Sequence, residues 1–133
     1  MITPIPLPYE MGSLEPYYDE ETLKIHYNTL YKGYVENLNK ANANLQKARD
    51  ERNFENIKCL EKDLSYNGSG VILHELFFTN MAPVDRTGQI SQRLVMQINR
   101  DFGNFGNFKL QFINSSKNVE ASRLGNISLG AKI

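Results

Sequence analysis

The chain contains two histidines, His26 and His74, so any chemistry that needs an imidazole must use one or both of them. Each lies among apolar residues at helical spacing. One interpretation is two separate core histidines, each hydrogen-bonded to its neighbours. The other is a pair of inward-facing ligands on two antiparallel helices, because neutral imidazole suits Fe, Mn, Zn and related ions. The residues alone leave both interpretations open.

Three further side chains could join such chemistry. Tyr34 follows His26 by eight residues on the same predicted helical face, so its hydroxyl could reach a site near His26, although plain packing is the alternative. Glu75 points about 100° round the helix from its neighbour His74, and we predict that it is a partly buried acid paired elsewhere. Cys59 has no basic partner nearby in sequence and is predicted to be a small buried apolar residue.

The apolar pattern predicts the helices that would position these groups. Asp19, followed by two acids, is typical of a helix start. Apolar residues then recur every three or four positions through residues 23–38, which predicts one long amphipathic helix. Residues 39–52 are weakly periodic, and we predict that this part runs into solvent or bends. A second helical pattern resumes at Phe54.

Residues 66–70, Tyr-Asn-Gly-Ser-Gly, interrupt this second pattern and admit two interpretations. They are either a helix break or a place where a helix backbone approaches another group closely. Residues 71–81 are apolar on nearly every side, which predicts a buried helix that Pro83 ends. Thr87 is predicted to open a third amphipathic helix, which Gly103 stops, and a short final helix follows.

Composition limits the functional class. Fifteen basic residues balance fifteen acidic ones, so the chain lacks the basic excess of a nucleic-acid-binding protein. No window approaches the roughly 20 apolar residues of a membrane span. The single cysteine allows no internal disulfide, and the start, with Pro4, Pro6 and Pro8, is predicted to be an extended arm and not a secretory signal. We therefore expect a cytoplasmic protein.

Several segments, in their order and spacing, resemble the iron/manganese superoxide dismutases. The matching stretches within residues 7–113 are 7–9 (LPY), 14–19 (LEPYYD), 22–26 (TLKIH), 34–39 (YVENLN), 70–78 (GVILHELFF), and 87–88 (TG) through 102–105 (FGNF) with 108–109 (FK). The resemblance implies a mainly α fold. A long antiparallel helical hairpin, residues 1–83, would be followed by residues 84–133, the opening helices of an α/β domain whose sheet is largely missing.

The same resemblance implies a function and a site. His26 and His74 would be metal ligands, and Tyr34 would be the active-site tyrosine that guards substrate entry. The ion would be Mn or Fe, with a slight preference for Mn because family members with glycine at the position of Gly70 tend to be the manganese type. Superoxide would be the substrate, converted to O2 and H2O2 by redox cycling of the metal. A homodimer or higher oligomer is implied, with no nucleic-acid or membrane partner.

The chain also departs from the family pattern. Leu30 stands where the first helix usually carries a second histidine, and Phe78 stands where a tryptophan is expected. No histidine follows His74, so the family's Asp-x-x-x-His ligand motif has no counterpart. The resemblance stops near Asn118, where the sheet should start, and we predict a truncated chain with an altered tail after Ala121.

Two functional hypotheses follow. The first is a superoxide dismutase that retains two histidine ligands but not the carboxylate ligand of the family. This chain alone is therefore expected to bind metal poorly and to be inactive or weakly active. The second is a non-catalytic helical module that associates with itself or a partner through uncovered apolar faces.

Overall fold

The computed structural model describes residues 1–118, and the predicted tail after Ala121 lies outside them. The chain divides into two compact units, residues 1–87 and a second unit that begins at Gly88, and each is described by itself. All regular secondary structure in residues 1–118 is helical. The predicted mainly α fold with a helical hairpin is therefore confirmed, while the predicted division at residue 83 stays a prediction.

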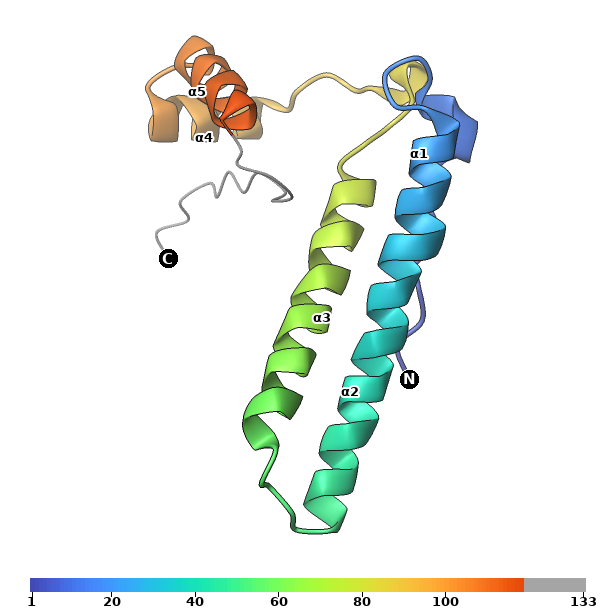
Figure 1. The fold of residues 1–133 in the computed structure, drawn as a ribbon. Coiled ribbons are helices and arrows are strands. Elements are labelled where there is room, and N and C mark those ends of the chain that lie inside the picture. The colour runs from blue at the N-terminus through green and yellow to red at the C-terminus, as the bar shows by residue number, and fades with distance from the viewer. Residues whose placement is uncertain (119–133) are drawn as a thin grey trace. The chain divides into compact units, whose positions relative to one another are not determined.

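The first arm of the hairpin is one continuous rod made of three segments (Figure 1). They are the α-helix α1 (Glu20–Ile25), the π-helical segment η2 (His26–Tyr31) and the α-helix α2 (Lys32–Asp50). As predicted, Asp19 caps the start, where its carboxylate accepts a hydrogen bond from the Thr22 backbone N–H at 2.8 Å. The π segment is where the rod carries its histidine, and π turns inside α-helices occur frequently at functional sites.

The second arm is the helix α3 (Ile57–Thr79), which lies antiparallel to α2 after a turn at residues 51–56 (Figure 1). It runs without interruption through Gly68 and Gly70, so the helix-break interpretation of residues 66–70 is wrong. The helix ends before Pro83, as predicted. Its last turns are less buried than predicted, because Ile72 and Leu76 are 59% and 53% exposed while Val71 and Phe78 are buried.

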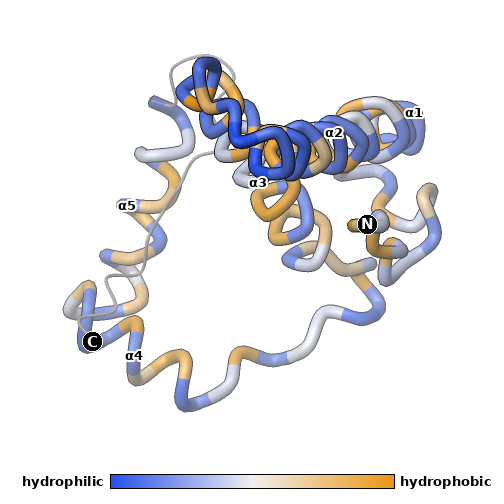
Figure 2. Tube along the Cα trace, turned by 90° about the horizontal axis from the view of Figure 1, so that it is seen from below, coloured by the Kyte–Doolittle hydropathy of each residue, from blue (hydrophilic) through white to orange (hydrophobic). Residues whose placement is uncertain are grey.

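The far part of α2 neither bends nor runs into solvent. It continues as a helix to Asp50 and buries Ala41, Leu45 and Ala48. Figure 2 shows why the sequence pattern was weak there, because α2 is mostly hydrophilic along its trace. Two of its three buried side chains are alanines, which contribute little to an apolar pattern but let the helices approach closely.

The N-terminal segment is extended, as predicted, and three tyrosines fasten it to the hairpin. Tyr27 donates a hydrogen bond from its hydroxyl to the Ile5 carbonyl at 2.6 Å, and the Ile5 N–H donates to the Tyr31 hydroxyl at 2.8 Å. Nearer the start of the rod, the Tyr9 hydroxyl donates to the Phe78 carbonyl at 2.9 Å. The short 3₁₀ turn η1 (Met11–Leu14) then leads into α1.

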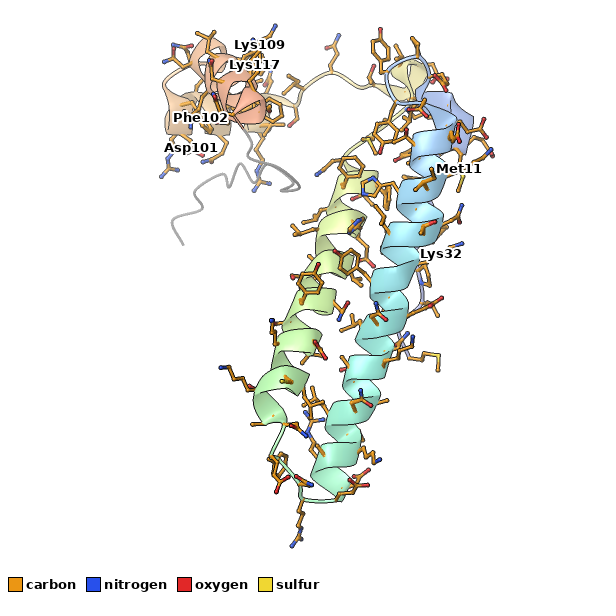
Figure 3. All side chains as sticks on the ribbon, in the orientation of Figure 1. Met11, Lys32, Asp101, Phe102, Lys109 and Lys117 are labelled. Atoms are coloured by element: carbon orange, nitrogen blue, oxygen red, sulfur yellow. The ribbon has the colours of Figure 1, made fainter. Side chains whose placement is uncertain are left out.

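The second unit contains a pair of helices, α4 (Gln92–Phe102) and α5 (Phe105–Lys117). Gly103, with φ of 82°, ends α4 as predicted, because this left-handed conformation favours glycine. The predicted start at Thr87 is wrong by five residues: residues 84–86 form the 3₁₀ turn η3 (Val84–Arg86), and the side chain of Ser91 caps α4. Phe102, labelled in Figure 3, packs against Phe108 with ring centroids 5.1 Å apart.

Candidate metal centre

The hairpin brings the two histidines together, and ring side chains lie between its two arms (Figure 3). His26 begins the π segment η2, and His74 lies in the last turns of α3. Their ring centroids are 4.9 Å apart and their planes meet at 78°. His74 is buried and His26 is half-buried. Two inward-facing imidazoles from antiparallel helices are thus the arrangement observed.

Each histidine is held through Nδ1. His74 Nδ1 lies 2.6 Å from the Gly70 carbonyl oxygen, which can only accept, so Nδ1 carries a proton and, in the neutral ring, the lone pair is on Nε2. His26 Nδ1 lies 3.0 Å from the Tyr18 hydroxyl, which can donate or accept. Engaging one ring nitrogen in this way fixes the orientation of a histidine whose other nitrogen binds a metal.

Burial keeps His26 neutral. Desolvation lowers the pKa of His26 below its ordinary value, and the nearby His74 lowers it further. Neutral imidazole is the form that binds a metal ion, because protonation removes the lone pair. The site therefore holds His26 in a state suited to a ligand at neutral pH.

Tyr34 lies beside His74, with ring centroids 5.1 Å apart. Its hydroxyl is 3.3 Å from the hydroxyl of Tyr66 on α3. This hydrogen bond is the largest cause that raises the pKa of Tyr34, and burial and the Tyr66 charge raise it further. Tyr34 therefore keeps its proton at neutral pH.

Gly70 is required by the position of Tyr34. A Cβ atom at residue 70 would lie 2.6 Å from Cε1 of the Tyr34 ring and closer still to Cδ1, well inside van der Waals contact. The close-approach interpretation of residues 66–70 is thus correct for Gly70. The same residue supplies the carbonyl that holds His74, so one backbone position serves both the ligand candidate and the tyrosine.

A shell of aromatic rings surrounds the histidines. Phe77 and Phe78 contact the His26 ring with centroids 4.9 and 5.2 Å away, and Tyr31 stacks on His74 at 6.1 Å. Burial is the main cause that raises the pKa of Tyr31 to about 12, and its hydroxyl donates to Glu75 at 2.9 Å. Glu75 is half-buried and paired with Tyr31, as predicted for an acid that faces away from the histidines.

The hairpin half of this site matches a known family. The sequence profile described as "Iron/manganese superoxide dismutases, alpha-hairpin domain" matches residues 3–82, which include His26, Tyr34 and His74. The chain belongs to the iron/manganese superoxide dismutase family. The resemblance seen in its sequence is therefore confirmed.

Individual superoxide dismutases are similar beyond the hairpin. A superoxide dismutase [Fe] of Pyrobaculum aerophilum is 38% identical over 116 residues, 86% of this chain and 55% of that protein. One of Methanothermobacter marburgensis is also 38% identical, over 87% of this chain and 58% of its own length. A superoxide dismutase [Mn/Fe] of Propionibacterium freudenreichii subsp. shermanii is 37% identical over the same shares. The chain spans a little over half the length of these relatives.

The residues present fit part of the metal shell of such a dismutase. Two imidazoles converge, which suits Fe or Mn, but within residues 1–118 no three His, Cys, Asp or Glu side chains lie close enough together to hold a metal ion. Cys59 is exposed, so its predicted burial is wrong, whereas the neighbouring apolar residues of α3, Ile57, Leu60 and Leu64, are half-buried. The histidines thus form a two-donor site.

Two contacts of this site were missing from the sequence-based prediction. Tyr18, which holds His26, lies eight residues before it, ahead of the Asp19 cap, so helical spacing could not have linked the two residues. Tyr66 was considered only as part of the interrupted pattern at residues 66–70. Its partner Tyr34 lies 32 residues away in sequence, so only the pairing of α2 with α3 reveals the contact.

No described helix is both long enough and apolar enough to cross a membrane.

Proposed function

We propose that this chain carries the helical-hairpin half of a superoxide dismutase site, in which His26 and His74 hold Fe or Mn. The observation that carries the proposal is the approach of the two imidazole rings to 4.9 Å inside the hairpin of this family. The orientation of His74 by the Gly70 carbonyl supports it, because that bond leaves Nε2 free for a metal. The names of the relatives support Fe or Mn as the ion.

The reaction proposed is the conversion of two superoxide ions and two protons to O2 and H2O2. When bound, the metal supplies one-electron exchange by alternating between its 3+ and 2+ states. The chain's own residues orient the ion and supply the surroundings. Phe77 and Phe78 cover the His26 ring and keep water from that side. The Tyr34 ring lies beside His74 and its hydroxyl keeps its proton, so this hydroxyl could donate a hydrogen bond to an anionic oxygen species.

For the choice between the two metals we propose manganese. The support is the glycine at position 70, which members of the family of the manganese type tend to carry. The structure adds a physical reason why a larger side chain is disfavoured there, since the Tyr34 ring fills the space beside Gly70. Metal analysis of the chain produced with equal Mn and Fe in the medium tests this, and more Fe than Mn would contradict it.

The main test compares metal content and superoxide consumption of the chain with His26→Ala and His74→Ala variants. Cys59→Ala is the matched control, because it removes an exposed thiol that could bind metal nonspecifically. We expect less than one Fe or Mn per chain, since two imidazoles fill only part of a coordination shell, with loss in both histidine variants and retention in the control. Metal content that is unchanged in both His26→Ala and His74→Ala would contradict the proposal. A full ion per chain with robust superoxide consumption would contradict the expectation of weak binding.

A second candidate function is a helical module that self-associates. Ile72 and Leu76 lie one helical turn apart on α3 and are each more than half exposed, which favours this alternative. The homodimer or higher oligomer implied by the family would also cover apolar surface. Light scattering on the metal-free chain tests association, and a well-behaved monomer would argue against it.

A further inference from the structure

Three residues of α3 line the ring of Tyr34. Tyr66, Gly70 and His74 follow one another at four-residue intervals, so they lie on one face of the helix. The Tyr34 ring meets Tyr66 with centroids 5.8 Å apart and His74 with centroids 5.1 Å apart. Between them, Gly70 has no side chain and the ring packs directly on the backbone. The ring of Tyr34 is thereby fixed along this face.

The hydroxyl of Tyr34 has a separate constraint. Within residues 1–118 its hydrogen-bond partner is the Tyr66 hydroxyl, at 3.3 Å. Leu30, one helical turn before Tyr34, has no polar group that could take this place. The direction of the Tyr34 O–H bond therefore depends on Tyr66, although the position of the ring does not.

Tyr66 also connects the pair to solvent. Its side chain is 63% exposed, whereas Tyr34 is half-buried between the helices. One end of the pair therefore lies beside His74 and the other in bulk water. A phenylalanine at position 66 would keep the ring contact with Tyr34 but would lose both the hydrogen bond and this connection.

We propose that Tyr66 is a positioning residue that orients the Tyr34 hydroxyl and is the water-facing end of a two-phenol hydrogen-bond chain. The inference rests on the proposed function, since it assigns Tyr66 a task in the site that His26, His74 and Tyr34 form. Tyr66 acts through Tyr34 and does not itself contact either histidine ring in the structure.

The test measures the hydroxyl environment of Tyr34 directly and needs no bound metal. The chain has seven tyrosines, so tyrosine labelled with 13C at Cζ gives seven signals, and Tyr34→Phe identifies the signal of Tyr34. The Cζ shift responds to the hydrogen bond of the attached hydroxyl. Tyr66→Phe removes one hydroxyl, and Tyr17→Phe is the matched control because Tyr17 is 82% exposed and remote from this contact.

We expect Tyr66→Phe to move the Tyr34 signal while the signals of Tyr27 and Tyr31 stay in place, and Tyr17→Phe to leave all three unchanged. An unmoved Tyr34 signal in Tyr66→Phe would overturn the inference, whatever the metal content. Equal movement of the Tyr27 and Tyr31 signals would also overturn it, because that result indicates general repacking. If the Tyr34 signal alone moves but metal content is unchanged in both histidine variants, the positioning by Tyr66 is supported and the proposed function is contradicted.

Discussion

The two ends of the hairpin bury different kinds of side chain. Toward the turn, α2 buries Leu38, Ala41, Leu45 and Ala48, whose spacing of three, four and three residues is that of a coiled-coil seam. Toward the other end, the arms bury tyrosine, phenylalanine and imidazole rings that contact one another edge to face. The seam joins the two helices through apolar packing alone. In the ring cluster, the buried polar atoms also need hydrogen-bond partners.

The ring cluster meets that requirement for its buried polar atoms. Among the described residues, every buried side-chain nitrogen or oxygen has a hydrogen-bond partner. His74 uses the Gly70 carbonyl, and Tyr31 uses Glu75 and the Ile5 N–H. An unpaired buried polar group costs about 1–3 kcal/mol, so packings of these rings that break the hydrogen bonds are disfavoured. Both ends therefore stabilise the hairpin by packing, and the ring end also fixes the positions of the site residues.

Phe78→Ala is expected to have the largest effect. Phe78 is fully buried, and its ring contacts both His26 and His74. Removing it should lower the free energy of unfolding by about 3–5 kcal/mol, because a cavity opens in the ring cluster. Urea unfolding followed by circular dichroism measures this, with the half-exposed Phe54→Ala as control, expected to change stability by about 0.5 kcal/mol or less. Equal losses in the two variants would contradict the ring cluster's role.

Leu45→Ala tests the other end of the comparison. Leu45 is 4% exposed in the coiled-coil seam, and its truncation should cost about 2 kcal/mol of unfolding free energy. The value lies at the low end for a buried leucine because the turn end of a two-helix hairpin can close over the gap. The NMR signals of the two histidine rings should stay in place. Movement of those signals comparable to that in Phe78→Ala would show that the two ends are not separable.

Gly70→Ala and Gly33→Ala are expected to have opposite signs. A methyl at Gly70 collides with three atoms of the Tyr34 ring, so the cost of overpacking lies in the upper part of the range of about 1–3 kcal/mol and exceeds the gain of about 1 kcal/mol from replacing a helical glycine. Nothing lies within 4 Å of a methyl at Gly33, so that variant should gain about 0.5–1 kcal/mol. Thermal unfolding measures both. Stabilisation by Gly70→Ala would show that Tyr34 moves aside freely.

Asp19→Asn, at the cap that starts the histidine-bearing rod, is expected to have the smallest effect. It should appear as a change in how stability depends on pH. Hydrogen bonds from Thr22 lower the pKa of Asp19, so its contribution is present above the unfolded-state pKa and is lost as pH falls through the folded-state value. Between pH 6 and pH 3 the midpoint of thermal unfolding should fall further in the native chain than in Asp19→Asn, which keeps a cap without titrating. Parallel decreases would argue against this contribution.

Much of the hairpin could be predicted from sequence because large apolar residues recur at helical spacing. The far part of α2 could not, because Ala41 and Ala48 are small and their burial depends on α3 lying close by. The start of α4 was predicted five residues too early, because Thr87 followed by glycine was chosen as the helix start. The residue that caps α4 is Ser91.

The site was predictable as far as the histidines and Tyr34, through spacing and family resemblance. The roles of Gly70 and Tyr66 were not, because each depends on a contact across the hairpin with Tyr34. A sequence pattern shows which residues share a helix face but not which ring on the opposite helix fills the space beside them. Tyr66 is the clearest example of such a residue, because nothing in its own sequence position indicates that it contacts Tyr34.

A Mn2+ titration observed by NMR tests most directly whether His26 and His74 bind one ion together, as proposed. The chain has two histidines, so two ring Cε1–H signals report the site, and His26→Ala and His74→Ala assign them. We predict that paramagnetic Mn2+ broadens both signals in parallel, that either alanine variant abolishes the broadening of the remaining signal, and that Mg2+ has no such effect. Broadening of one histidine that persists without the other would contradict a shared site.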